Sequence, residues 1–380
     1  MKTSLFQYKE GSWLPHPLNN GLHDHDIHLV LCFAGKKRTE EPDLYPALAK
    51  KFPASAVVLC STAGEIFGET VTDDSVSVAA LQFDKTRIHA EKITVTDYTN
   101  SYEAAKALAA KLPKKDLAYI LVFSDGSLVN GSELVRAMND ATGNSILVTG
   151  GLAGDGSSFH STLAGLNEHA IPGRIIAIGF YGSSITVTHG SQGGWDMFGP
   201  EREITRSAGN VLYEMDGKSA LDLYKKYLGP EAGQLPGSAL LFPLSVTMTG
   251  TANPVVRTIL SIDEKNNSMT FAGDVPEGSK VRFMKANFDK LTSAASAAAH
   301  NTEIPEKINP AFSLLISCVG RKLILGQRIE EEVEAVAETF GHQTPLAGFY
   351  SYGEISPFNE GGACRLHNQT MTITSFYELS

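Results

Sequence analysis

Gly64-Glu65-Ile66 and Gly353-Glu354-Ile355 repeat one triplet near opposite ends of a 380-residue chain. Each copy follows an apolar run typical of a buried strand and precedes a run in which apolar and polar residues alternate. A motif that recurs in an equivalent context indicates that the chain contains repeated structural units.

Three stretches of the sequence share one order of predicted elements: strand, helix, strand, loop and strand. They occupy residues 28–83, 119–182 and 312–377. In the middle stretch, Gly154-Asp155 stands about where the other two carry Gly-Glu. We therefore predict an α+β fold of two related modules built from β-α-β-β units, with mixed sheets whose last strand runs antiparallel to its predecessor and with helices covering one face.

The Gly-Glu loops are candidates for a ligand site. Glycine at the end of a buried strand permits a positive φ or a close approach to a ligand, and the neighbouring carboxylate supplies an acceptor at the rim. Strand, loop and strand are expected to form a hairpin that protrudes from one end of its sheet. A plain turn carrying a solvated acid remains the alternative for Glu65, Glu354 and Asp155.

Composition narrows the class of protein. A hydrophobic content of 42% over 380 residues is enough for sizeable cores and predicts two domains. The net charge of −10 argues against a nucleic-acid partner, which would need clustered Lys and Arg. The four cysteines lack metal or disulfide spacing, and no signal peptide or membrane span is evident, so a reduced, cytoplasmic protein is expected. The cluster at residues 23–28 is interpreted as a solvated lead-in, and no metal site is predicted.

A boundary between modules is expected where prolines and glycines gather, at residues 228–237. This gives a lead-in at 1–27, a first module at 28–229 and a second module at 230–380. Between residues 240 and 286 the sequence predicts further strands, followed by an Ala- and Ser-rich helix from Asn287 to about His300.

Five motifs in succession resemble the FIST family, with its N-terminal and C-terminal modules in their usual order. They lie at residues 60–66, 150–155, 189–214, 318–321 and 348–355. The resemblance covers nearly the whole chain. It implies an intracellular sensory module that binds a small ligand and passes the signal to a separate partner, a histidine kinase or a cyclic-di-GMP enzyme.

Some stand-alone members of the family are haem proteins that sense nitric oxide, so the resemblance makes haem b a possible cofactor. An axial ligand must lie in an apolar pocket. His189 is the candidate, because it stands at the end of a strand beside a glycine-rich loop with Trp195 and Phe198. A surface or capping histidine is the alternative.

Cys318 and Arg321 are candidates at the end of a strand in the last unit. An arginine fork there would hold a carboxylate or a haem propionate, and it would lower the pKa of the nearby thiol. A buried thiol beside a surface arginine is the alternative. Tyr350 and Tyr352 are expected to share a face and to offer hydroxyls at the same end. The corresponding rim of the first unit comprises Cys60, Ser61, Thr62 and Glu65, and a pocket between the halves is predicted.

Several functions remain open at this point. We expect a non-enzymatic sensor, with haem and nitric oxide as the leading ligand. A sensor of amino acids or other small metabolites is one alternative. A cysteine-dependent enzyme that uses Cys318, for which no partner histidine is evident, is another. A protein-interaction scaffold is the third.

Overall fold

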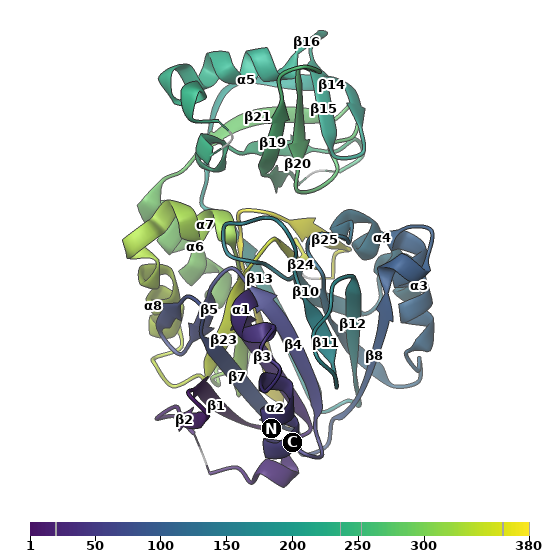
Figure 1. Ribbon diagram of the computed structural model, residues 1–380, viewed down its shortest axis with the longest axis vertical. Coiled ribbons are helices and arrows are strands. Elements are labelled where there is room, and N and C mark those ends of the chain that lie inside the picture. Colours follow the sequence, from purple (N-terminus) through teal and green to yellow (C-terminus); the bar gives the residue numbers. More distant parts are fainter. Residues whose placement is uncertain (20, 236, 252, 359–360, 380) are drawn as a thin grey trace.

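The computed structural model describes residues 1–19, 21–235, 237–251, 253–358 and 361–379. Figure 1 shows two bodies. The main body holds both termini and most of the chain, and the upper body is made of residues 196–285.

In the part of the chain that the structure describes, three six-stranded sheets build the main body. In spatial order, the first contains β11 (Ala164–Leu166), β4 (Ala56–Thr62), β3 (Leu29–Gly35), β7 (Val76–Gln82), β1 (Lys2–Lys9) and β2 (Ser12–Pro15). The second contains β25 (Cys364–His367), β24 (Gly353–Pro357), β10 (Leu147–Leu152), β9 (Leu117–Ser124), β12 (Arg174–Tyr181) and β8 (Arg87–Thr94). The third contains β13 (Ile185–Gln192), β26 (Met371–Glu378), β22 (Phe312–Cys318), β23 (Leu346–Ser351), β5 (Glu65–Phe67) and β6 (Thr70–Thr72).

The same pairing recurs at the centre of each sheet. Two strands joined by a helical crossover run parallel in β3–β4, β9–β10 and β22–β23. The last strand of each unit then pairs antiparallel with the first, as in β3–β7, β9–β12 and β22–β26. The predicted α+β class and its repeated units are therefore confirmed.

The expected hairpins do not form, and this part of the prediction is wrong. In each unit, the strand before the loop and the strand after it are separated by the unit's first strand. The loop segment instead joins the sheet of another unit: β5 pairs with β23, β24 pairs with β10, and β11 pairs with β4. Each unit thus donates a strand to a neighbour, which closes the three units into a ring.

The central core lies where the inner faces of the three sheets meet. Phe33, Phe123 and Phe349 come one from each unit, with ring centroids 4.9 to 6.1 Å apart. Because both faces of these sheets are covered, the central strands are continuous apolar runs rather than alternating ones. Burial in this shared core is the main favourable contribution to folding.

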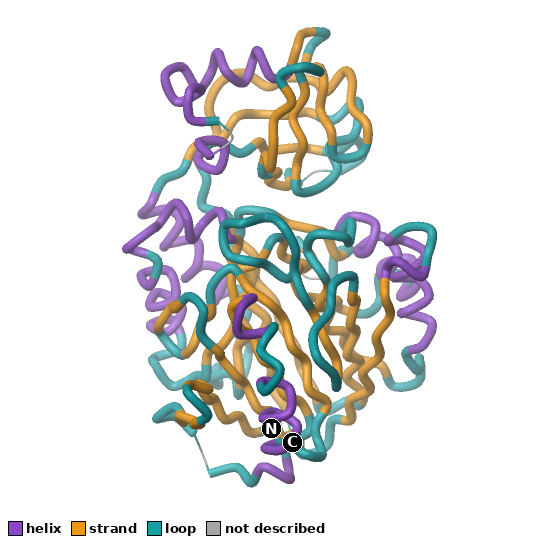
Figure 2. The backbone as a smooth tube through the Cα atoms, viewed as in Figure 1, coloured by secondary structure: helices purple, strands orange, loops and turns teal. Residues whose placement is uncertain are grey.

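Helices cover the outer faces of the sheets, as Figure 2 shows. Those of the main body are α1 (Lys36–Thr39), α2 (Leu44–Lys51), α3 (Ser101–Lys111), α4 (Gly131–Thr142), α6 (Phe288–His300), α7 (Val319–Leu325) and α8 (Glu330–Thr339). Asn100, Asn130 and Asn287 cap three of them by accepting hydrogen bonds from the first turn. Among the described residues, no helix combines the length and the apolar character needed to cross a membrane.

The first two sheets also contain a strand that the sequence analysis did not assign, namely β1 and β8. Residues 1–27, expected to be a lead-in, hold β1 and β2, and β1 pairs with β7 along six residues, from Lys2 to Gln7. Residues 24–26 of the same segment form a short 3-10 helix.

The upper body has its own sheet and core. Its strands are β14 (Asp196–Ala208), β15 (Val211–Met215), β16 (Lys218–Ser219), β17 (Leu244–Thr247), β18 (Val255–Arg257), β19 (Ile259–Asp263), β20 (Ser268–Phe271) and β21 (Lys280–Lys285). Helix α5 (Ala220–Leu228) packs against this core. The expected boundary at residues 229–230 falls at the start of a 3-10 helix, Gly229–Gln234, inside this body. Pro236, part of the expected linker, lies outside the described residues.

Candidate functional site

A ring of equivalent backbone contacts joins the three units where their parallel strands end. In each contact, a residue just after one unit's second strand donates an N–H to the carbonyl of a neighbouring unit. The three bonds are Ala63 N to Tyr350 O (2.8 Å), Gly154 N to Ser61 O (2.9 Å) and Tyr352 N to Leu152 O (3.2 Å). Loops from all three units therefore converge at one place.

This ring of hydrogen bonds shows that the loop of the second unit aligns with the other two loops one residue away from the predicted match. Gly154 takes the position of Ala63 and Tyr352, so that Asp155, and not Gly154, matches Gly64. The close approach expected of a glycine is nevertheless present at Gly154, where a Cβ atom would lie 2.8 Å from the backbone nitrogen of Ala63.

Glu65 is buried rather than placed on a solvated rim. The Thr62 hydroxyl donates to one of its carboxylate oxygens, and the backbone N–H and hydroxyl of Ser75 donate to the other, each at 2.7 Å. Burial nevertheless raises the pKa of Glu65 to about 7, because desolvation of the charged form outweighs these hydrogen bonds.

Glu354 repeats this arrangement in the third unit. Ser351 Oγ donates to it at 2.8 Å, and Thr370 donates through its N–H at 3.2 Å and its hydroxyl at 2.9 Å. Desolvation raises the pKa of Glu354 to about 8. Both acids thus tie the end of one strand to the start of the unit's last strand, and a solvated turn is excluded for both.

Asp125 has the corresponding role in the second unit, and the sequence analysis did not identify it. Its carboxylate accepts the N–H of Gly173, just before β12, at 3.0 Å, and it is fully buried. The signal for it was a carboxylate directly after the first strand of a unit, in Ser124-Asp125-Gly126.

The three-unit pocket is a cavity of about 380 Å³ beside this ring. It is lined by residues from all three units: Gly35, Lys36, Lys37, Thr62, Ala63, Gly64, Glu65, Asp73, Asp74, Asp155, Gly156, Ser157, Ser158, Val319, Lys322 and Leu323. Thr62, Glu65 and Asp155 were predicted from the sequence, and the three lysines, Asp73 and Asp74 were not.

Charges of both signs face each other in the three-unit pocket. Lys322 Nζ donates to Ala63 O at 2.9 Å and pairs with the Asp73 carboxylate. Its side chain is only 16% exposed, so this ammonium group is fixed by its surroundings. Lys36 Nζ donates to the Ser161 hydroxyl.

Gly64 makes room for the side chain of Lys322. It has a φ of +138°, and a Cβ atom there would lie 2.8 Å from Lys322 Nζ. The predicted need for glycine at this loop therefore has a specific cause, which is the side chain of another unit crossing over its Cα atom.

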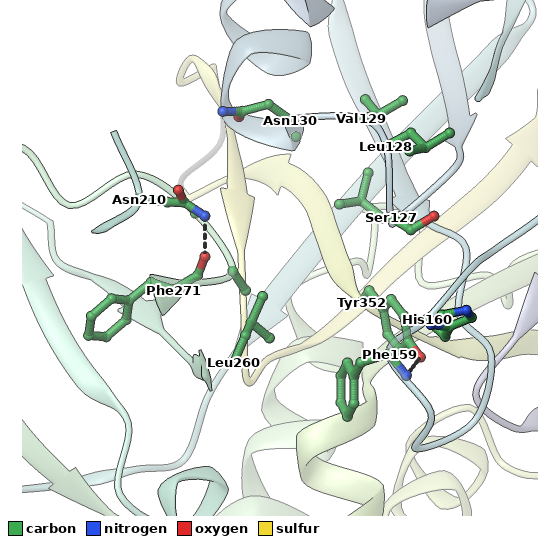
Figure 3. Close-up of a pocket in the computed structure, with 15 residues that line it drawn as sticks. Ser127, Leu128, Val129, Asn130, Phe159, His160, Asn210, Leu260, Phe271 and Tyr352 are labelled. Carbon is green, nitrogen blue, oxygen red and sulfur yellow. Dashed lines mark hydrogen bonds between the residues drawn. The ribbon is translucent and has the colours of Figure 1, made fainter. Parts of the chain in front are cut away.

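Tyr350 and Tyr352 point to different places. Tyr350 is fully buried and donates to Glu332 Oε1 at 2.8 Å. Tyr352 reaches the opposite side of the loops, where its hydroxyl donates to Asp155 and its ring lines a second cavity (Figure 3). The predicted shared face does not exist.

The predicted ligand clamp at Arg321 is wrong, because this side chain is fully buried. It forms an ion pair with Glu332 through Nε and Nη2, at 2.9 and 2.7 Å. The remaining guanidinium contacts are the carbonyls of Gly193 at 2.6 Å and Leu291 at 2.9 Å. Arg321 therefore joins helix α7 to helix α8, to α6 and to the chain entering the upper body.

The predicted reactive thiol is also wrong. Cys318 is 3% exposed, and burial raises its pKa instead of lowering it. Cys60 is buried, and desolvation raises its pKa as well. Ser61 is buried between the first two units, where it donates to Gly154 O and accepts from Leu163 N, both at 2.8 Å.

The residues proposed for a haem do not fit one around His189. His189 lies on strand β13, opposite Thr374. Trp195 donates its ring N–H to Gln369 O at 2.8 Å and packs against the core of the third sheet. Phe198 packs in the separate core of the upper body. The expected walls of a flat pocket are thus divided between two cores.

Two family models match the chain. The FIST N domain matches residues 28–218, and the FIST C domain matches residues 220–357. An uncharacterized protein of Methanocaldococcus jannaschii, MJ1623, is 22% identical to the chain, covering 90% of it and 72% of the relative.

Solved structures of cyanuric acid hydrolase are similar at low score. One, from A. caulinodans, has a TM-score of 0.33 and 7% identity, covering 94% of this chain and 92% of the hydrolase. Another has a TM-score of 0.35 and 11% identity, covering 99% of each chain. These neighbours are enzymes, in contrast to the expectation of a non-enzymatic protein. Scores this low assign no hydrolase activity to the chain.

The two family matches adjoin at residues 218 and 220 and extend over most of the sequence. FIST modules are sensory domains of signal-transduction proteins. By these matches, the chain belongs to the FIST family.

Proposed function

We propose that this chain is a cytoplasmic sensory protein that binds a small zwitterionic metabolite, of the amino-acid class, in the three-unit pocket. The observation that carries the proposal is the fixed pairing of Lys322 with Asp73 at a junction to which all three units contribute. A ligand bound there contacts every unit at once.

The balance of charges in the pocket favours a zwitterion over a ligand that carries only negative or only positive charge. Three lysines line the pocket together with Asp73, Asp74, Asp155 and Glu65. A phosphate or a dicarboxylate would meet these carboxylates, and a simple cation would meet the lysines. An α-amino acid places its carboxylate toward the amines and its ammonium group toward the acids, and such charge-assisted hydrogen bonds are the strong ones.

Binding itself can be tested by thermal unfolding with each of the twenty amino acids. A ligand that binds the native state raises the unfolding temperature as its concentration increases. The expected result is a shift for a chemically related subset of amino acids. No shift with any of them at millimolar concentration would remove the amino-acid class from the proposal.

The family resemblance supplies the proposed partner, a histidine kinase or a cyclic-di-GMP enzyme. Ligand occupancy affects the partner only if bound and free protein differ in affinity for it, and the partner then changes ligand affinity by the same factor. Reconstitution with a candidate enzyme tests this. Equal enzyme activity with and without ligand, at concentrations where the complex forms, would contradict signalling to that enzyme.

Haem and nitric oxide are not part of this proposal, because the residues around His189 do not fit a haem. Protein expressed with ample haem is expected to show no haem absorption band. The cysteine-dependent alternative also loses its support, because Cys318 is buried and its pKa is raised.

A further inference from the structure

A second cavity lies between the main body and the upper body, and Figure 3 shows the residues that line it. This interdomain cleft has a volume of about 390 Å³. The main body contributes residues 126–131, Leu152, Phe159, His160 and Tyr352, and the upper body contributes Asn210, Leu260 and residues 271–273. A smaller cavity of about 330 Å³ continues from it, with Phe159 and Leu260 common to both.

Phe159 has an unfavourable backbone conformation that directs its ring into this space. Its φ is +52°, in the left-handed region that bulky residues avoid, and the residue is 42% exposed. Neighbouring contacts hold the loop: Phe159 N donates to the Tyr352 hydroxyl at 3.0 Å, and the next two N–H groups donate to Asp155 Oδ2. Strain that the surroundings maintain in this way is characteristic of functional sites.

The Phe159 ring forms a platform with Tyr352. The two rings are stacked, with centroids 4.7 Å apart and planes 17° apart. Since Tyr352 covers one face of Phe159, the exposed area lies on the opposite face and at the edges. The exposed part of the Phe159 ring is a surface on which a flat molecule can stack.

Other large apolar side chains are exposed around the same space. Leu128 is 54% exposed and Leu323 is 43% exposed on the main body, and Leu260 is 42% exposed on the upper body. Exposed apolar side chains that gather on facing walls mark binding sites more often than scattered ones do.

The cleft differs from the three-unit pocket in charge. Among the described residues that line the two adjoining cavities, there is no Lys, Arg, Asp or Glu. The Asn210 amide nitrogen donates to Phe271 O at 2.7 Å, which leaves its oxygen to accept an N–H from a ligand. The lining therefore suits an uncharged ring that carries a few polar atoms.

The geometry points to a second ligand site: the interdomain cleft binds a neutral, planar heteroaromatic molecule that stacks on Phe159 and contacts Leu260 of the upper body. Such a ligand bridges the two bodies. This site goes beyond the proposed function, because it uses none of the charged residues on which the zwitterion depends, although Leu323 lines both sites.

The test measures binding of indole and adenine by saturation-transfer NMR and calorimetry, with cyclohexanol as a non-planar control. Wild type is expected to bind a planar probe in preference to cyclohexanol. Phe159→Ala is expected to weaken that binding about tenfold, the effect of losing one stacked ring. Phe159→Tyr, which keeps the ring, is expected to restore it.

Three further variants keep the test decisive. Leu260→Ala, on the other body, is expected to weaken planar-probe binding in the same direction even if Phe159→Ala does not fold. Phe288→Ala removes a ring that is similarly exposed, at 43%, on helix α6, and it is expected to have no effect. Lys322→Met is expected to leave indole binding unchanged, which separates this site from the three-unit pocket.

Absence of planar-probe binding by wild type at millimolar concentration would overturn the inference. Equal affinity of wild type, Phe159→Ala and Leu260→Ala would overturn it as well, because the probe would then bind elsewhere.

Discussion

The Tyr352 hydroxyl donates a hydrogen bond to the Asp155 carboxylate, and this contact joins the third unit to the second. Asp155 lines the three-unit pocket, whereas Tyr352 lines the interdomain cleft. The same hydroxyl accepts the N–H of Phe159 at 3.0 Å. One phenol group therefore holds the loop that separates the two cavities.

Tyr352→Phe is expected to loosen this loop without removing the aromatic stack. Loss of the hydroxyl should lower the free energy of unfolding by about 1 kcal/mol. Hydrogen exchange at the amides of residues 159–161 should accelerate more than exchange in the sheets. Tyr102→Phe is the control, since Tyr102 also donates to a carboxylate, at 2.7 Å, but on the surface. Unchanged exchange in Tyr352→Phe would show that the loop is held by other contacts.

Stability should decrease as the pH rises through neutrality. The pKa of Glu65 is about 7 and that of Glu354 about 8, both above the ordinary value of 4.5. A group whose pKa is raised in the folded state contributes stability that is complete below its unfolded pKa and is lost as pH rises through its folded pKa. Denaturant titrations between pH 5 and pH 8 should therefore show a fall on the order of a few kcal/mol.

Glu354→Gln should reduce this dependence, because one of the two titrating acids is gone while Glu65 remains. Glu10→Gln, at an exposed turn, should not change it. A stability that is level or rising across this pH range in the wild type would contradict raised pKa values for the two acids.

Arg321→Ala should lower the free energy of unfolding more than it weakens ligand binding. The change leaves the fully buried Glu332 without its partner, and breaking a buried ion pair costs about 3 to 5 kcal/mol. Arg328→Ala is the control, because its ion pair with Glu331 is exposed to solvent and contributes little to stability. Urea denaturation of both variants tests the difference. Equal stability of the two would mean that the Arg321 pair contributes no more than a surface pair.

The four cysteines should be unreactive in the native protein. All are buried, and desolvation raises the pKa of each thiol, so little thiolate is present near neutral pH. Alkylation followed by mass spectrometry should label the denatured protein at all four positions and the native protein slowly at each. Rapid, selective labelling of native Cys318 would contradict its burial and revive the cysteine-dependent alternative.

The repeated units were predictable from sequence because their signal is local. Apolar runs such as residues 29–35 and 312–318 are long enough to identify as buried strands, and the Gly-Glu-Ile triplets mark equivalent positions. The exchange of strands between units was not predictable, because the partner of Glu65 is Phe349, far along the chain.

The candidate site was predicted in part for the same reason. Thr62, Glu65 and Asp155 lie in the loops that carried the motif, and the structure places them at one pocket. Lys322 reaches that pocket from another unit, and neighbouring Arg321 turns inward, although the two are adjacent in sequence. Which of the two faces the pocket depends on helix α7 and its tertiary contacts.

The central claim is that the three-unit pocket binds an amino acid through Lys322. Calorimetric titration of the amino acid that most raises the unfolding temperature, into wild type, Lys322→Met and Lys106→Met, tests this most directly. The account predicts that Lys322→Met loses roughly 10- to 100-fold in affinity, the worth of a charge-assisted hydrogen bond, while Lys106→Met, at an exposed position of α3, binds as wild type does. Equal affinity in all three proteins would contradict it.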